Sequence, residues 1–318
     1  MKLQPVELEA DAWDALLAEH EAGTPFHRAW WYRGWGMSPQ VHAVADGSGR
    51  VYGGCLLGLK RRGPWQCVER PPFTALNGPL VFGEVSRPQR LEILEALLDA
   101  MQGIALTDFV LEPGDIDALP WLWHNYRQQL RLTYVIPTAW ANDWRERISR
   151  HHRRNLRKAH QALTGTHQIE RGDDPAAIAD FLQDVANEKG FAPVSAEAWK
   201  SWAAARRDID TACYRLVVDG ETTAVGLVIA DARCAWYLIG GVVRGAAGGM
   251  PHAMVLMERM IDDALASGRD FDFEGSVLPG VERFFRGWGA EPRPIVRMTK
   301  IQPLPLQLAW WWRQRRRH

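Results

Sequence analysis

Apolar residues recur along this chain at two spacings, which separate helices from strands. Positions three and four apart predict helices over 86–103 and 251–267. Alternating or continuously apolar runs predict strands over 41–60 and 213–243. The second of these runs reverses at Asp219-Gly220, two residues that tolerate the positive φ of a tight hairpin. The chain is therefore expected to contain helices and antiparallel strand pairs joined by short turns.

The two halves of the chain follow the same order of elements. In each half an antiparallel meander is followed by a helix and then by one more strand, over 108–112 in the first half and 271–275 in the second. This order predicts a mixed α/β (α+β) fold of two tandem halves, each with a mixed, mostly antiparallel sheet flanked by helices. The expected organisation is an N-terminal half (1–140), a basic connecting helix (141–165), a C-terminal half (166–303) and a tail rich in Trp and Arg (304–318).

Composition and charge narrow the class of protein. Of the 318 residues 47% are hydrophobic, and 38 Lys and Arg balance 38 Asp and Glu, so the chain has the core of a globular protein and no overall charge to attract nucleic acid. The four cysteines form no CxxC pair and no two histidines stand at metal-ligand spacing, so we expect buried free thiols and no metal. The start of the chain lacks an apolar signal segment and no run of about 20 apolar residues occurs, which favours a cytoplasmic location.

The string FDFEGS near the end of the second half offers candidate catalytic groups. Strand alternation places Asp272 and Glu274 on one face, near the end of a strand. Two neighbouring carboxylates raise the pKa of at least one of them, which suits a general base. The alternative is structural, an ion pair with Arg269, Arg283 or Arg286. The pattern leaves both interpretations open.

A glycine-rich bend over 244–249 connects a predicted strand to the start of a helix. Open backbone N–H groups at such a bend, together with the dipole of the helix, favour an anion. Arg244, Gly245, Gly248 and Gly249 are therefore candidate phosphate-binding residues. An ordinary turn from strand to helix is the alternative.

Basic residues concentrate over 145–160. On a helix, a narrow apolar seam with Leu156 and Ala159 interrupts a strongly positive face, which would attract RNA, a nucleotide cofactor or anionic lipid. The alternative is a linker helix whose charges only keep it soluble. The candidates for contacts with a substrate or phosphate are Arg153, Arg154, Lys158 and, from the second half, Arg286.

The tail over 304–318 combines leucines and three consecutive Trp residues with several arginines. Trp beside Arg suits a membrane interface, so peripheral membrane contact is one interpretation. The other is a tail packed on the body of the protein with a basic end.

Several strings occur in a characteristic order along the chain. TPFHRAWW (24–31) is followed by RLTYVI (131–136), by RRNLRKA (153–159) and by FDFEGS (271–276) with a further FFR and WG over 284–289. Their order and spacing resemble the GNAT superfamily of acyltransferases, in its Fem-like (FemAB-type) double-GNAT branch. The resemblance covers most of the chain and implies two GNAT-like halves.

The resemblance also implies direct transfer of an acyl group to an amine, without a covalent enzyme intermediate. The donor would lie between splayed strands of the C-terminal half, with 244–249 around its phosphates. Backbone N–H groups over 235–240 would stabilise the tetrahedral oxyanion. Glu274 or Asp272 would take the proton of the amine, and Tyr237 is the candidate acid.

Three functions are compatible with these observations. The first is an N-acyltransferase that uses acetyl-CoA or another acyl-CoA thioester and an amine acceptor, a small molecule or a peptide. The second is an aminoacyltransferase that uses aminoacyl-tRNA and acts on a peptidoglycan precursor or a small peptide, and the basic helix suits this donor. The third is a non-catalytic protein of the same fold that binds RNA or a membrane.

Overall fold

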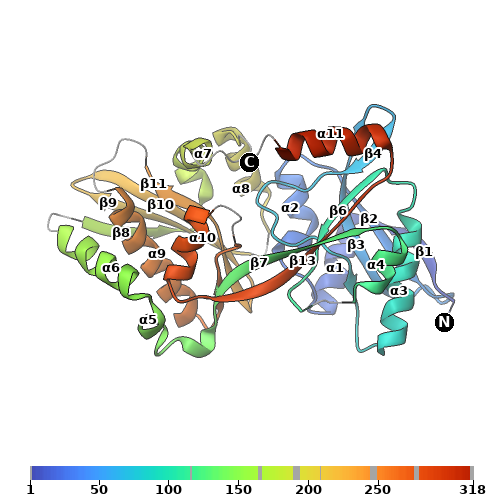
Figure 1. Cartoon of the computed structure of the whole chain (residues 1–318), viewed down its shortest axis with the longest axis horizontal. Helices are drawn as coiled ribbons and strands as arrows, with labels where there is room; N and C mark the ends of the chain where they lie inside the picture. The colour runs from blue at the N-terminus through green and yellow to red at the C-terminus, as the bar shows by residue number, and fades with distance from the viewer. Residues whose placement is uncertain are drawn as a thin grey trace. The chain divides into compact units, whose positions relative to one another are not determined.

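The computed structural model describes residues 2–114, 117–163, 167–188, 194–207, 209–243, 249–275 and 279–315. The chain folds into two compact units, one made of Met1–Arg131 with Pro294–His318 and the other of Leu132–Arg293. Two long strands, β7 (Arg127–Ile136) and β13 (Glu291–Ile301), each contribute residues to both units (Figure 1). From the sequence, each half is expected to be one continuous segment. In the structure the end of the chain, Pro294–His318, belongs to the first unit instead.

The sheet of the first unit is antiparallel except at one pair of strands. Its order is β1-β2-β3-β4-β6-β13, with β6 parallel to β4 and the other neighbours antiparallel. A short strand, β5, pairs with β3 on the other side of this path. The bounds are β1 (Gln4–Leu8), β2 (Pro39–Ala45), β3 (Val51–Arg62), β4 (Trp65–Val68), β5 (Leu80–Val81) and β6 (Leu106–Val110).

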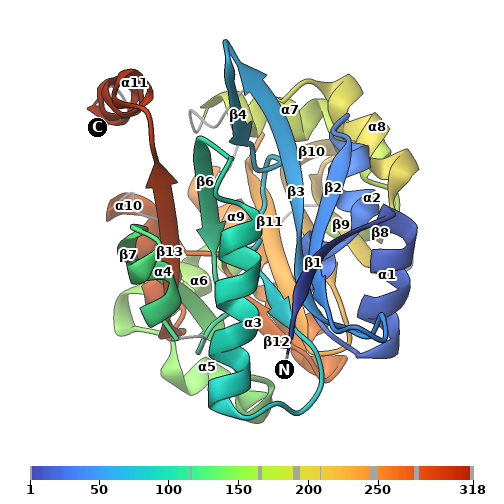
Figure 2. The same ribbon diagram turned by 90° about the vertical axis from the view of Figure 1, so that its right-hand side faces the viewer.

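Helices cover both faces of this first sheet. Successive residues of a strand point to opposite faces, and Gly53 and Gly54 of β3 leave room for different helices. The Cβ position of Gly53 faces Ile93 of α3, whereas that of Gly54 faces Trp13 of α1. Figure 2 shows α3 and α1 on opposite sides of β3. The helices of the unit are α1 (Ala10–Glu19), η1 (Pro25–His27), α2 (Ala29–Gly34), α3 (Arg87–Ala100), α4 (Leu119–Trp123) and α11 (Leu304–Arg315).

The sheet of the second unit repeats the same plan. Its order is β8-β9-β10-β11-β12-β7, with β12 parallel to β11 and the other neighbours antiparallel. The hairpin between β9 and β10 turns at Asp219-Gly220, both with positive φ, as the sequence predicts. The bounds are β8 (His167–Gly172), β9 (Asp210–Val218), β10 (Glu221–Ala230), β11 (Cys234–Val242) and β12 (Asp270–Asp272).

One long helix, α9, carries most of the core of the second unit. Its residues Met254, Met257 and Ile261 are buried against the sheet, as the predicted stripe requires. The Cβ position of Gly226 in β10 meets the sulfur of Met260, so the helix lies close to the strands. The helices of the unit are η2 (Thr138–Trp140), α5 (Trp144–Arg147), α6 (Arg150–Ala162), η3 (Pro175–Ile178), α7 (Ala179–Glu188), α8 (Ala196–Ala205), α9 (Gly249–Ala266) and α10 (Pro279–Gly287).

The connecting helix expected over 141–165 is two helices rather than one, so its prediction as a continuous element is wrong. Ile148 is buried and extended, with ψ 131°, and this ends α5. Ser149 then caps α6, because its hydroxyl accepts the N–H of His152 at 3.2 Å. The sequence pattern did not resolve this break, since a Ser cap inside a basic run does not interrupt the helical spacing.

The expected fold class is confirmed, whereas the burial expected of all four cysteines is wrong for Cys234, which is half-buried. Each unit holds a mixed, mostly antiparallel sheet flanked by helices, and each follows the order of meander, helix and parallel strand. The four cysteines are free thiols, and Cys55, Cys67 and Cys213 are buried. Burial raises the pKa of the Cys55 and Cys213 thiols to about 12, so they are inert members of the core.

Candidate active site in the second unit

The parallel strands β11 and β12 pair over only three residues. The last pair joins Trp236 to Asp272, and β11 then continues through Val242. A bulge in β11 at Leu238 also shifts its register against β10, because Val228 pairs with Tyr237 and Leu227 with Ile239. The strands therefore diverge at Asp272, which leaves a stretch of β11 backbone without a partner from β12.

Asp272 lies at the point of divergence and is buried, with 8% of its surface exposed. Its carboxylate accepts a hydrogen bond from the Thr133 hydroxyl and another, of 2.7 Å, from the backbone N–H of Glu274. Burial raises the pKa of Asp272 to about 6, and the two hydrogen bonds only partly oppose this effect. The carboxyl group therefore changes its protonation state close to neutral pH.

Glu274 follows β12 in a left-handed backbone conformation, with φ 60°. A non-glycine residue rarely adopts this conformation, which is often found at functional sites. Burial, and next the charge of Asp272, raise the pKa of Glu274 well above its usual value. Its Oε1 atom is buried and makes no hydrogen bond to the described residues. A buried acceptor without a partner is costly, so this oxygen is available to a bound donor such as an amine.

The backbone around Glu274 leaves little freedom. Gly275 has φ 64°, and a Cβ atom placed there would lie 2.1 Å from the carbonyl oxygen of Leu132. Phe273 donates its backbone N–H to the carbonyl of Tyr134 at 2.9 Å. The two carboxylates are thus held by β7, whose residues Thr133 and Tyr134 pack beside the end of β12.

The predicted ion pairs with arginines do not form among the described residues. Arg286 pairs with Glu282 at 3.1 Å, and Arg269 pairs with Asp210 at 2.5 Å. The structural alternative for the two carboxylates therefore lacks its partner in this part of the chain. Arg286 is 64% exposed on α10, and nothing in the geometry places it beside the two acids.

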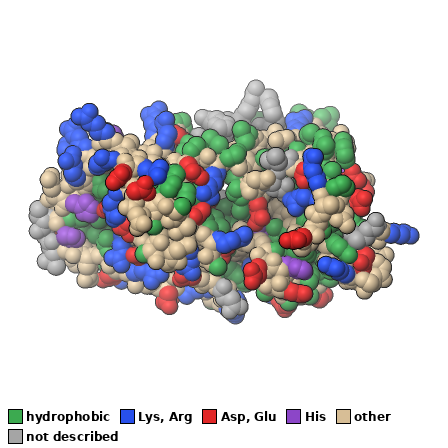
Figure 3. All heavy atoms as spheres, turned by 90° about the horizontal axis from the view of Figure 1, so that it is seen from below, with side chains coloured by type: hydrophobic (Ala, Val, Ile, Leu, Met, Phe, Trp, Pro, Cys, Tyr) green, Lys and Arg blue, Asp and Glu red, His purple; other side chains and the backbone are tan. Residues whose placement is uncertain are grey.

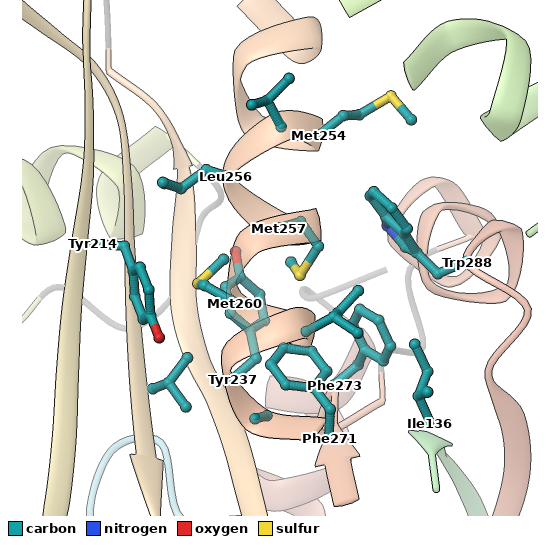
Figure 4. Packing of buried hydrophobic residues seen from close by; sticks show 14 of the residues in the cluster. Ile136, Tyr214, Tyr237, Met254, Leu256, Met257, Met260, Phe271, Phe273 and Trp288 are labelled. Atoms are coloured by element: carbon teal, nitrogen blue, oxygen red, sulfur yellow. The ribbon is translucent and has the colours of Figure 1, made fainter. Parts of the chain in front are cut away.

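Tyr237 is the first residue of β11 beyond the paired stretch. It belongs to the apolar core around α9, where Figure 4 shows it near Met260. The ring of Tyr237 also meets that of Phe285 edge to face, with centroids 6.4 Å apart. Phe271 and Phe273 pack in the same cluster, with ring centroids 4.9 Å apart. Burial raises the pKa of Tyr237, so its hydroxyl stays protonated at neutral pH.

The predicted phosphate bend lies largely outside the described residues. Arg244, Gly245 and Gly248 fall within the undescribed stretch 244–248, whereas Gly249 is the first residue of α9 and has φ 54°. Near the start of the same helix, the buried His252 ring nitrogen Nδ1 lies 2.9 Å from the Thr223 hydroxyl. This contact fixes the N-terminus of α9 to β10, and the sequence pattern did not single it out.

The basic helix α6 has the predicted narrow seam and positive face. Leu156 and Ala159 are buried, whereas Arg154 and Lys158 are exposed. Arg153 is different, because its guanidinium donates to the carbonyl groups of Glu146 and Ile148 at 2.8 and 3.0 Å and so closes the end of α5. Lys and Arg side chains gather at the left-hand end of the molecule in Figure 3, the end that carries α6 in Figure 1.

The tail forms a helix, α11, that packs partly on the first unit. Leu306 is buried with Cys67 and Leu106, whereas Leu304, Leu308 and Trp312 are exposed. These three exposed residues are four apart and share one face of the helix. No helix in the described part of the chain is long and apolar enough to span a membrane.

A repeated string relates the two units and was not recognised in the sequence. In the first unit the string DFVLE begins at Asp108 in β6 and ends at Glu112, just after the strand. In the second unit the string DFDFE begins at Asp270 in β12 and ends at Glu274, just after that strand. Each string comes directly after a helix, α3 in the first unit and α9 in the second. In each unit the strand that lies parallel to the string, β4 or β11, precedes that helix. The first acid of each string binds an arginine of β13, Arg297 for Asp108 and Arg293 for Asp270.

The repeat differs at one position that matters for chemistry. Where the second unit has Asp272, the first unit has Val110, which is buried in the core. A glutamate with an aspartate two residues before it therefore occurs only in the string of the second unit. Comparison of the two strings alone could have identified Asp272 as the distinguishing acid.

Comparisons with known proteins agree with this geometry. Residues 145–286 match the family model of an acetyltransferase (GNAT) domain, Acetyltransf_6. The fold is similar to the crystal structure of FemX, with a TM-score of 0.67, 15% identity, and 96% of this chain and 99% of that chain covered. No curated protein sequence matches the chain.

Two further solved structures have the same fold. A tandem GNAT protein from the clavulanic acid biosynthesis pathway has a TM-score of 0.55 at 14% identity, with 94% of this chain and 98% of that chain covered. The structure of L-PGS from Bacillus licheniformis has a TM-score of 0.56 at 12% identity, with 95% of each chain covered. The chain therefore shares its fold with these proteins over nearly its whole length, and the resemblance noted in its sequence is confirmed at the level of the fold.

Proposed function

We propose that this chain, a double-GNAT protein with an acetyltransferase domain over 145–286, is an N-acyltransferase whose reaction takes place in the second unit. It would transfer an acyl group from an acyl-CoA thioester to an amine of a small molecule or peptide. The observation that carries the proposal is the pair of acids at the point where β11 and β12 diverge: Asp272, which is buried, and Glu274, whose Oε1 atom is buried.

The shape of the second unit fits an extended donor. Beyond Trp236, β11 is no longer paired with β12 in the described part of the chain, and an extended, amide-bearing donor such as coenzyme A could run along this part of β11. The start of α9 follows β11 closely, and the N-terminus of a helix favours the phosphates of such a donor. Gly249 lies at this N-terminus, beside the proposed phosphate residues Arg244, Gly245 and Gly248.

The reaction needs one group to remove a proton and one to supply it. The amine nitrogen attacks the thioester carbonyl carbon, and the resulting intermediate carries a positive nitrogen and a negative oxygen. The pair of Asp272 and Glu274, after losing one proton to solvent, accepts the proton of the nitrogen on Glu274. Backbone N–H groups over 235–240 donate to the negative oxygen until the carbon–sulfur bond breaks. Tyr237 is the candidate donor of the proton that the departing thiolate takes.

Raised pKa values suit this use of the two carboxylates. An amine remains protonated near neutral pH, and a base with an ordinary carboxyl pKa removes its proton inefficiently. Burial brings the pKa of Asp272 to about 6 and raises that of Glu274 further above its usual value. The loss of one proton to solvent before reaction would leave the pair ready to accept another from the substrate.

A second donor, aminoacyl-tRNA, is favoured by one observation. Arg154 and Lys158 lie exposed on α6, within a helix that has no acidic residue. Such a face attracts a phosphate backbone. The same pair of carboxylates would serve either donor, since both donate an acyl group to an amine.

A titration of thermal stability distinguishes these donors. The full chain is heated with coenzyme A, acetyl-CoA or bulk tRNA at near-physiological salt. A ligand at 100 times its dissociation constant stabilises a protein by about 2.7 kcal/mol, which is readily measured. Stabilisation by acetyl-CoA without an effect of tRNA supports the thioester. Stabilisation by tRNA alone supports aminoacyl transfer, and no effect of any of the three contradicts both and favours a non-catalytic role.

A further inference from the structure

The first unit contains a pocket of about 950 Å³ that the proposed reaction does not use. It lies among the end of α4, the start of β7, the second half of β13 and the start of α11, all within the first unit. Its lining includes three cations, Arg127, Arg297 and Lys300. The described residues that line it include no Asp or Glu. The pocket therefore presents a positive surface.

Hydrogen-bonding amides make up much of the rest of this surface. Five glutamines and one asparagine line the pocket, together with Trp123, whose side chain is 58% exposed. Amide groups donate and accept, so they suit a ligand with hydroxyl or amide groups. An exposed indole ring is a platform on which a sugar or another flat apolar face can pack. Such a lining suits a polar ligand rather than an apolar one.

Arg297 is held in place from behind the pocket wall. The Asp108 carboxylate accepts from Nε and Nη2 of Arg297 at 2.6 and 2.8 Å, which is a bidentate pair. The Thr299 hydroxyl, which also lines the pocket, donates to the same carboxylate at 3.3 Å. Asp108 is only 6% exposed, so this arrangement fixes the plane of the guanidinium at the wall.

Positive charge exceeds negative charge around this buried pair. Nε of Arg70 lies 3.3 Å from the same Asp108 carboxylate, and the Arg131 side chain is close enough to interact with all three charges. Burial, and next the charges of Arg70 and Arg297, lower the pKa of Arg131. Two guanidinium groups, those of Arg297 and Arg70, thus contact one carboxylate with a third nearby, so positive charge is in excess behind the pocket wall, which favours an anion in the pocket.

The acidic residues near the pocket are already engaged. Asp99, outside the lining, accepts from Gln102 at 2.6 Å and lies 3.0 Å from Nε2 of His124. It also raises the pKa of Lys300, although burial has the larger and opposite effect. Asp99 therefore compensates only part of the charge of Lys300, Arg127 and Arg297.

We propose that this pocket binds a small, polar organic anion. Its phosphate or carboxylate oxygens would bind Arg297, Lys300 and Arg127. Its hydroxyl or amide groups would bind the surrounding glutamines, and a ring would pack on Trp123. The proposal rests on residues of the first unit alone, so it stands or fails separately from acyl transfer in the second unit.

Three probes that share one sugar ring test the chemistry of this site. Glucose 6-phosphate carries a phosphate, glucuronate carries a carboxylate, and glucose carries no charge. Binding of each to the full chain is measured by isothermal titration calorimetry at fixed ionic strength. We expect glucose 6-phosphate or glucuronate to bind and glucose not to bind, and the stronger of the two anions identifies the preferred group. Failure of both anions to bind would overturn the proposal.

Variants assign the binding to the pocket. Lys300→Gln and Arg127→Gln each remove one charge from the lining and should weaken the bound anion roughly tenfold, the loss of one charge-assisted hydrogen bond. Lys60→Gln is the matched control, because Lys60 is a 61% exposed residue of β3 outside the pocket. Thermal unfolding establishes that each variant is folded. Anion binding that all three variants leave unchanged would contradict the assignment.

Discussion

The backbone N–H of Glu274 donates a 2.7 Å hydrogen bond to the carboxylate of Asp272. The bond spans two residues and bends the chain directly after β12, so that Glu274 adopts a positive φ and Gly275 follows with another. Simple strand alternation predicts two acids side by side on one face. The structure instead couples them through a turn in which Asp272 and the Oε1 atom of Glu274 are buried, and burial raises the pKa values of both residues.

The stability of the protein should depend on the protonation of Asp272. Its pKa is raised from 3.8 in the unfolded chain to about 6 in the fold, so the folded state binds the proton more tightly. The contribution of Asp272 to the free energy of unfolding is therefore greatest below pH 3.8, and it declines as the pH rises to about 6. Asp272→Asn removes this titration but keeps an oxygen that accepts hydrogen bonds.

Chemical denaturation between pH 3.5 and 7 measures the effect. The stability of Asp272→Asn relative to the original protein should increase across the window from pH 3.8 to about 6. Asp219→Asn is the control, because Asp219 is exposed in a hairpin turn whose positive φ asparagine tolerates. Its curve should run parallel to that of the original protein. Parallel curves for Asp272→Asn would show that Asp272 is not buried in the folded state as described.

The turn after Glu274 should tolerate no side chain at position 275. In Gly275→Ala the new Cβ atom would meet the Leu132 carbonyl oxygen at 2.1 Å, in a backbone conformation with φ 64°. Strain and the forced shift of β7 should lower the free energy of unfolding by about 2 kcal/mol or more. Gly280→Ala, where nothing lies within 4 Å, should change stability by less than about 0.5 kcal/mol. Equal stability of the two variants in urea would refute this description of the turn.

Local patterns predicted most of the elements of each unit. The helix expected over 86–103 begins with a capping box, in which the Gln89 side chain accepts the backbone N–H of Ser86 at 2.9 Å. The buried stripes of α3 and α9 and the turn at Asp219-Gly220 also follow the pattern. These features depend on residues a few positions apart, so the sequence contains the information directly.

Long-range pairings could not be predicted in the same way. Strand β13 pairs with β6 through partners such as Met298 and Phe109, which are far apart in the chain. The sequence pattern does not state which unit such a strand joins. At the site, the two acids were identified by type and spacing, but their burial depends on Thr133 and Tyr134 of β7. A partner strand from another part of the chain determines the electrostatics of the site.

The exposed face of α6 should matter only if the donor is a nucleic acid. Arg154→Gln combined with Lys158→Gln removes two exposed charges of α6. If tRNA binds there, the dependence of log affinity on log salt concentration should decrease by roughly 0.7 to 0.9 for each lost phosphate contact. Arg50→Gln, an exposed change in the first unit, is the control. Unchanged tRNA binding in the double variant would exclude α6 as its site, and acetyl-CoA binding should be unaffected in all variants.

The assignment of the reaction to the second unit predicts opposite results for two equivalent glutamates. Glu274 and Glu112 end the repeated strings of β12 and β6, but only Glu274 has an aspartate two residues before it. Glu274→Gln should therefore reduce turnover about 10²- to 10⁴-fold, the usual contribution of a general base. Glu112→Gln should leave turnover unchanged.

The most direct measurement is the release of free thiol from acetyl-CoA in the presence of a panel of primary amines. It is made on the original protein, Glu274→Gln and Glu112→Gln, with thermal unfolding to establish that each is folded. Amine-dependent release that is lost in Glu274→Gln and retained in Glu112→Gln is the result we predict. Release that Glu274→Gln retains in full, or that both variants lose equally, would contradict acyl transfer by the carboxylate pair of the second unit.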